Sequence, residues 1–361
     1  MIALRLYQRY LMRETLAAVF LVLAAFLALY SFFDLINELR RVGNQGYQAG
    51  HAVVVVLLSM PGLVYELVPI ATLIGTLYAL STLARHSEIT VLRASGLATS
   101  ELLGTLFRVA AILALVTLIV GEALVPLSER LAQEIKARAL SKVIAQRGFE
   151  SGLWVKDGQS FINVRKAHPD ARLEGVRIYR FDAGNALESV TEAQEAVFEP
   201  PDHWILKGVV RTSLDGERSS VERFAETEWR SALNPQLLSV LMVSPDRLSL
   251  IGLLDYTRHL TDNRQQTGRY EIAIWKKLVY PLTAFVMVAL ALPFGYSHNR
   301  VGGVSLKLFA GVMFGILFYM LNGLFSNLGV INAWPPFASA TAPSALFLLA
   351  AIGMLWWVER R

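Results

Sequence analysis

The chain has 361 residues, 54% of them hydrophobic and 17% charged, with a mean hydropathy of +0.44, which excludes an ordinary soluble protein. It has no cysteine, so a disulfide scaffold is excluded as well. The formal net charge of +5 comes mainly from cations in short segments between apolar stretches and does not indicate a nucleic-acid-binding protein.

An apolar stretch at 16–33 is the first of six predicted membrane-spanning helices, because about 20 apolar residues cross roughly 30 Å of hydrocarbon. It is longer than the core of a signal peptide and lacks a small-x-small cleavage site before Asp34, so we expect it to stay in the mature chain. Residues 1–15 carry three arginines at helical spacing. They form either an amphipathic interfacial helix or a simple basic anchor.

Two arginines follow the first span, in DLINELRRVGNQGY. Arg40 and Arg41 are a candidate site for an anionic lipid, because guanidinium groups bind phosphate in a bidentate manner. Local pairing with Asp34 or Glu38, or simple anchoring of the helix, explains them equally well.

The second predicted span lies within 52–84, where Glu66 is the only charged residue. Pro61 and Pro69 predict a kinked or irregular helix. A carboxylate inside the membrane is a candidate for a functional site. Glu66 could face the same cavity as the arginine pair, or it could sit at the interface without a role.

A polar segment, RHSEITVLRASG, separates the second span from the third. Ser87 as N-cap, an apolar pair on one face and Gly96 just past the end predict a helix of about two turns within 86–96. So short a helix needs a surface to pack against. It is either a loop on the membrane surface or a coupling helix that inserts into a cytoplasmic motor. The residues predicted for coupling are Glu88, Ile89, Leu92 and Arg93.

Any motor belongs to another chain. The sequence has no Gly-x-x-x-x-Gly-Lys-Ser/Thr phosphate loop and no cytoplasmic segment large enough for an ATPase. We therefore expect this chain to bind no cofactor and a partner subunit to bind ATP. We also expect Glu88 to contact a basic residue of that partner.

The third span covers about 102–125 and leads into an external segment, 127–270. Short alternating runs such as GVRIYRF and HWILKGVVRTSL, separated by turn residues, predict an all-β sandwich or jelly roll. The three histidines of this segment are scattered and no catalytic motif is present. A binding or handover role is therefore favoured over catalysis.

Residues 244–282 connect this domain to the remaining spans. Asp246 is a plausible N-cap of a helix, and Gly268 marks a turn before a second helix. The segment is either a lever or a mere connector. The fourth span is predicted at 278–297, and the uncharged run 308–358 is divided into the fifth and sixth by 326–336.

Lysine and arginine counts predict the orientation. Ten cations flank the spans on one side, against only Arg40 and Arg41 on the other. The positive-inside rule then places both termini and the polar segment in the cytoplasm, and about 127–277 outside. The predicted fold is a polytopic α-helical membrane protein with an inserted β domain, divided into 1–126, 127–270 and 271–361.

These features together resemble the LptF/LptG permeases of the lipopolysaccharide export ABC transporter, most of all the LptG subunits. The resemblance covers essentially the whole chain and rests on three spans either side of a β domain, and on the stretches DLINELRRVGNQGY, SEITVLRASG, GEALVPLSE, GLWVKDGQSFINV and GRYEIAIWKKLVYPL. It implies the inner membrane of a Gram-negative bacterium, with a periplasmic jelly roll. The implied partners are an LptF-like permease subunit, an LptB-like ATPase dimer and an LptC-like bridge protein.

The resemblance also assigns residues. Glu88 matches the coupling-helix glutamate, and Arg40 and Arg41 match the basic pair that faces the phosphates of lipid A. Asp34 stands where some relatives have a further basic residue, so the phosphate contact is expected to differ. Lys136 is a weaker candidate for the sugar-phosphate core. Phe314 and Phe318 could offer an apolar receiving surface, although helix packing explains them equally well.

Two other classes of function compete with an ABC permease. A membrane-anchored periplasmic enzyme would require a catalytic set in 127–277, and none is found. A proton-coupled secondary transporter of an amphiphile, using Glu66, would work without an ATPase.

Overall fold

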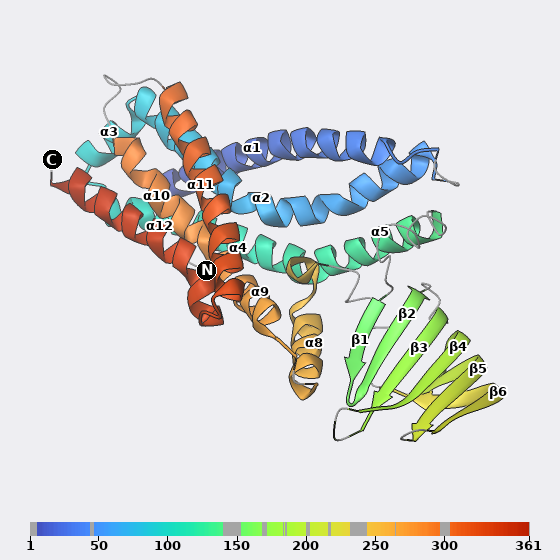
Figure 1. The fold of residues 1–361 in the computed structure, drawn as a ribbon. Helices are drawn as coiled ribbons and strands as arrows, with labels where there is room; N and C mark the ends of the chain where they lie inside the picture. Colours follow the sequence, from blue (N-terminus) through green and yellow to red (C-terminus); the bar gives the residue numbers. More distant parts are fainter. Residues whose placement is uncertain are drawn as a thin grey trace.

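Long helices of the chain gather into one bundle, with a β-sheet to one side (Figure 1). The computed structural model describes residues 6–43, 47–139, 153–167, 172–182, 184, 186–199, 203–215, 218–231, 244–263, 265–296 and 304–360. Within these ranges, six helices are long and apolar enough to cross a membrane. The predicted number of spans is therefore confirmed, on length and composition.

The first half of the bundle is a long hairpin followed by a continuous third helix. The basic first turns and the first span form one continuous helix over 6–39. The second helix runs through both of its prolines and bends (Figure 1). Each of these two helices is about 50 Å long at 1.5 Å per residue. The elements are α1 (Leu6–Leu39), α2 (Ala49–Arg85), α3 (Glu88–Ala94), α4 (Thr99–Ile119), the π-helix η1 (Val120–Leu124) and α5 (Val125–Ala139).

The second half begins with the connector, residues 244–282. The predicted N-cap at Asp246 is wrong: that residue lies in a 3-10 turn, and the Ser249 side chain caps the helix by accepting from the Gly252 amide. The fifth span continues to Ile331, so much of 326–336 is helical. The elements are η2 (Pro245–Arg247), α8 (Leu250–Asp262), α9 (Gly268–Val279), η3 (Tyr280–Leu282), α10 (Thr283–Tyr296), α11 (Val304–Ile331) and α12 (Pro336–Glu359).

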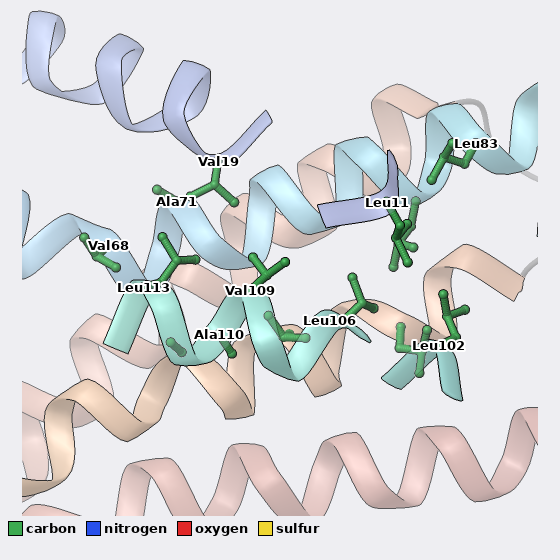
Figure 2. Close-up of a cluster of buried hydrophobic side chains, with 14 of the residues drawn as sticks. Leu11, Val19, Val68, Ala71, Leu83, Leu102, Leu106, Val109, Ala110 and Leu113 are labelled. Atoms are coloured by element: carbon green, nitrogen blue, oxygen red, sulfur yellow. The ribbon is translucent and has the colours of Figure 1, made fainter. Parts of the chain in front are cut away.

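The core of the bundle lies where α1, α2, α4 and α10 meet. Figure 2 shows Val19 of α1, Ala71 of α2 and the α4 side chains Leu106, Val109 and Ala110, all members of one buried cluster. Small residues alternate with leucines at these contacts, and this lets the helix backbones approach closely.

Gly75 marks a close approach of α1 and α2. A Cβ built on Gly75 would lie 2.5 Å from the Cα of Val19, a backbone atom that cannot move alone. We expect Gly75→Ala to force the two helices apart and to destabilise the chain by about 1–3 kcal/mol or more. The matched control is Gly62→Ala in the same helix, where nothing lies within 4 Å. The midpoint of thermal unfolding in detergent measures both, and equal midpoints would refute the close approach.

The β domain is a six-stranded antiparallel sheet in the order β1-β2-β3-β4-β5-β6. Its all-β character is confirmed, whereas the jelly roll is not, since the described strands follow one another in a single sheet. One face is buried, including Ile162 paired with Ile178 and Val164 paired with Val176. The strands are β1 (Leu153–Asp157), β2 (Ser160–Ala167), β3 (Arg172–Phe181), β4 (Leu187–Glu199), β5 (His203–Asp215) and β6 (Arg218–Arg230).

The sheet is fastened to the connector. The backbone amide of Gly158, in the β1–β2 turn, donates to Oδ1 of Asn263 at the end of α8, at 2.7 Å. In Figure 1 the sheet lies toward the end of the molecule where the α1–α2 hairpin turns and α5 ends, and α3 and the C-terminus lie at the opposite end. The bundle therefore separates the polar α3 segment from the β domain.

Candidate functional site

Four polar side chains meet where the α1–α2 hairpin turns, and we name them the Glu38 cluster: Glu38, Arg41, Tyr47 and Lys136. Glu38 ends α1, Tyr47 precedes α2, and Lys136 lies on α5. Lys136 Nζ is 2.8 Å and Arg41 Nη1 is 3.6 Å from Glu38 Oε1. The Tyr47 hydroxyl donates to Glu38 Oε2 at 3.0 Å. Both oxygens of this buried carboxylate are thus engaged, as burial of a charge requires.

Tyr47 is the fixed part of this cluster. It is 1% exposed and packs against Ala52 of α2 and Ala139 of α5. Burial, and then the hydrogen bond to Glu38, raise the pKa of Tyr47 far above its usual value, so its hydroxyl stays a donor at neutral pH.

The predicted basic residues are brought together in part. Local pairing with Glu38, which the sequence allowed for Arg41, is present, and Lys136 shares the same carboxylate. Arg40 is exposed. Lys136 was predicted separately from the arginine pair, and only the approach of α5 to the hairpin unites them.

Glu66 lies apart, at the level of the connector. Its backbone carbonyl accepts a hydrogen bond from the Tyr280 hydroxyl at 2.8 Å. The Tyr280 ring stacks on Tyr65, with centroids 4.8 Å apart, and Tyr65 lies so close to Gly121 of the π-helix that a Cβ there would clash with the ring. Three helices therefore converge beside Glu66, at one of the π-bulges that often mark functional sites.

Two ion pairs fasten the connector to the third span, and we name them the connector ion pairs. Lys277 Nζ is 3.2 Å from Glu122 Oε1, and Arg247 Nη1 is 2.9 Å from Glu129 Oε2. Glu122 Oε2 also accepts from the backbone amide of Leu250, the first residue of α8, at 2.9 Å. The carboxylate of Glu122 thus satisfies a free donor at a helix N-terminus.

Burial alone would lower the pKa of Arg247, but the carboxylate of Glu129, together with those of Glu66 and Asp34, outweighs it and raises that pKa. Neither ion pair was predicted from the sequence. The sequence signal for these pairs is weak: GEALVPLSE contains two glutamates, Glu122 and Glu129, and the connector, far along the chain, contains cations.

The polar segment forms α3 within its predicted range. Ile89 is 5% exposed and belongs to the core of the bundle, whereas Glu88 and Leu92 are half-buried and Arg93 is exposed. The prediction that the Ser87 side chain caps this helix is wrong. Ser87 occupies the N-cap position with φ of 61° and makes no capping hydrogen bond.

Gly96 ends α3 as predicted. Its φ is +90°, a conformation that favours glycine. The Gly96 amide donates to the Arg93 carbonyl and the Leu97 amide to the Leu92 carbonyl, at 2.9 and 3.1 Å, which is a Schellman motif. A buried anchor and a sharp stop therefore hold this two-turn helix in place.

The two α11 phenylalanines that were predicted to offer an apolar receiving surface, Phe314 and Phe318, face the interior of the chain. Phe318 is 2% exposed and packs on Phe347 of α12, with ring centroids 5.1 Å apart. Phe314 is half-buried and contacts Phe294 and Phe347. In this conformation Phe318 has a packing role, because too little of its side chain is exposed to contact a ligand. A binding role for Phe314 remains a prediction.

Comparison with known proteins identifies the family. A family model described as "Lipopolysaccharide export system permease LptF/LptG" matches residues 9–357. The chain belongs to the LptF/LptG family. The lipopolysaccharide export system permease protein LptG of Escherichia coli (strain K12) is 31% identical over 352 residues, covering 96% of this chain and 97% of the relative. The LptG of Haemophilus influenzae is 29% identical over 356 residues, covering 98% of each.

Membership of the LptF/LptG family confirms the resemblance drawn from the sequence. The matched residues include the Glu38 cluster, the connector ion pairs and α3, so all three lie in the part of the chain that the family model covers. The family is described as a permease of an export system, that is, a component of a transporter. The roles of individual residues in this LptF/LptG permease stay predictions.

Proposed function

We propose that this LptF/LptG permease extracts lipopolysaccharide from the outer leaflet of the inner membrane and passes it to a periplasmic bridge, driven by a separate ATPase. The observation that carries the proposal is the arrangement of two sites at opposite ends of α2. The Glu38 cluster lies where α2 begins, and α3 follows directly where α2 ends. One helix therefore joins a candidate phosphate site to a candidate site of energy input.

Phosphate recognition is the role proposed for the basic residues. Arg40 is exposed, and the side chains of Arg41 and Lys136 share one carboxylate. Arginine binds phosphate in a bidentate manner, and lysine adds a mobile point charge. The phosphates of lipid A supply the matching anions.

The acyl chains require an apolar surface and an external source of energy. Each buried CH₂ contributes about 0.8 kcal/mol, so several chains together do not leave a bilayer quickly unaided. In their most apolar stretches, α1 is 11% buried and α11 is 22% buried, the lowest values among the six helices described as candidate spans. These two helices offer the surface for an LptF-like subunit and for a lipid between the two subunits.

The ATPase is expected to bind α3. We expect an LptB-like dimer to receive this helix in a groove, with a basic residue of the ATPase on Glu88. Ile89 anchors the helix to the core, so that a push on α3 reaches α2 and α10. The connector ion pairs would then carry the movement of the third span to the β domain, which we place in the periplasm with a jelly-roll form and an LptC-like partner.

The proposed function is tested by reconstitution. The chain is purified with its partner subunits, placed in proteoliposomes with lipopolysaccharide, and release to a soluble periplasmic acceptor is measured. Release that requires ATP and ignores a protonophore supports the proposal. Release that follows a proton gradient without ATP would instead establish a secondary transporter using Glu66.

Removing the arginine pair should weaken binding of the phosphorylated headgroup. A hydrogen bond to a charged group contributes about 1.5–3 kcal/mol, so Arg40→Ala/Arg41→Ala is expected to lower affinity for bisphosphorylated lipid A roughly tenfold or more. The matched control, Arg258→Ala/Arg269→Ala, removes two exposed cations from the connector. Binding in nanodiscs measures both. Equal affinities in the two double variants would remove Arg40 and Arg41 from the binding site.

A further inference from the structure

We propose that Glu38 is an internal counter-ion that holds Lys136 and Arg41 when no lipid is bound and yields them to the phosphate of the lipid. This inference rests on the proposed function and adds a residue that regulates affinity at the same site. Glu38 does not bind the lipid itself, since like charges repel. It acts through the cations that the lipid needs.

The geometry makes Glu38 a substitute for a phosphate. Lys136, at 2.8 Å, and Arg41, at 3.6 Å, both reach Oε1, while Tyr47 reaches Oε2. The three partners come from three separate segments: the turn after α1, the stretch that leads into α2, and the helix α5. A carboxylate that collects two cations from different elements occupies the position an incoming anion would take.

The cluster has a rigid half and a mobile half. The Glu38 side chain is 11% exposed and Tyr47 is 1% exposed, so these two stay where they are. The side chains of Lys136 and Arg41 are 20% and 53% exposed, and both are long and flexible. The cations can therefore turn toward a ligand without moving a helix.

Exchange of partners has an energetic consequence. When the cations move to a phosphate, Glu38 keeps only the Tyr47 hydrogen bond among its contacts with the described residues, and a buried carboxylate with too few partners is unfavourable. Glu38 thus lowers the affinity for lipid and favours its release, because the ion pairs re-form when the lipid leaves. A transporter needs such a balance, since a substrate bound too tightly is not passed on.

Glu38→Gln tests the proposal because it removes the charge and keeps an acceptor for Tyr47. In the full complex in nanodiscs, we expect bisphosphorylated lipid A to bind about tenfold more tightly, which corresponds to about 1.4 kcal/mol. Dephosphorylated lipid A should bind as it does to the unaltered complex. ATP-driven release should be correspondingly slower.

A double-mutant cycle separates this role from a structural one. In a Lys136→Met background, Glu38→Gln is expected to give a clearly smaller increase, because one of the two cations it would liberate is absent. If Glu38 only positions Lys136, Glu38→Gln would weaken binding, and that result, like unchanged binding, overturns the proposal. Should Glu38→Gln fail to yield a folded complex, Glu38→Asp keeps the charge but withdraws it by one methylene. It should tighten binding by about threefold, and no tightening would likewise overturn the proposal.

The same data distinguish failure of the wider function. If Lys136→Met and Arg41→Ala each leave binding of bisphosphorylated lipid A unchanged, the phosphate site itself is wrong. If both variants weaken binding while Glu38→Gln does not tighten it, the site stands and only the counter-ion role falls.

Discussion

Glu88→Ala should lower ATP-driven release of lipopolysaccharide at least tenfold while the chain stays folded. Glu88 is the first residue of α3 and is half-buried, and the packing of this helix depends on Ile89 instead. Its carboxylate also interacts with the exposed Tyr10 hydroxyl of α1, a surface contact whose loss should leave the chain folded. We expect the carboxylate to meet a cation of the ATPase. Losing a charged hydrogen bond costs about 1.5–3 kcal/mol, which is roughly tenfold or more in coupling.

The measurements for Glu88→Ala are retention of the ATPase subunit on purification, ATP turnover and lipid release. Glu14→Ala is the matched control, because it removes the same charge from an exposed position on α1. A comparison with Ile89→Ala separates chemistry from packing, since that change removes a core side chain and should lower thermal stability as well. If the ATPase is retained and its turnover and lipid release are normal in Glu88→Ala, α3 is not the coupling element.

Glu122→Ala should destabilise the chain by about 3 kcal/mol or more. The Lys277 side chain is 6% exposed and would lose its carboxylate partner, and the first amide of α8 would lose its acceptor. Breaking a buried pair from one side leaves an uncompensated charge, and this typically costs 3–5 kcal/mol. The midpoint of thermal unfolding in detergent measures the effect.

A double variant identifies the stranded charge as the cause. Glu122→Gln/Lys277→Met removes both charges, so it should be clearly more stable than Glu122→Ala even though two residues are changed. If the double variant is no more stable than Glu122→Ala, the loss comes from side-chain packing rather than from the buried lysine. Lipid release by the double variant then reports whether the connector must be held to the third span for transport.

Much of the architecture follows from local patterns in the sequence. Charge-free stretches of sufficient length predicted six spans, because a helix in hydrocarbon must be apolar over about 20 residues wherever it sits in the fold. Alternation and turn residues predicted strands between the third and fourth spans. The polar segment RHSEITVLRASG, with Gly96 at its end, predicted α3, because a left-handed position at a helix C-terminus favours glycine for local steric reasons alone.

The sequence by itself therefore determined which segments are helices, which are strands and where the short polar helix stops. Only the tertiary structure decided which charges meet. Helix packing that no local pattern encodes brings Glu38 to Lys136. It also brings Glu129 to Arg247, which lies 118 positions further along the chain. The same reason explains why Phe318 lies inside and why Asp246 pairs with Lys276, 30 positions away. Each depends on what a neighbouring element presents, and a residue cannot specify a distant neighbour by its own chemistry.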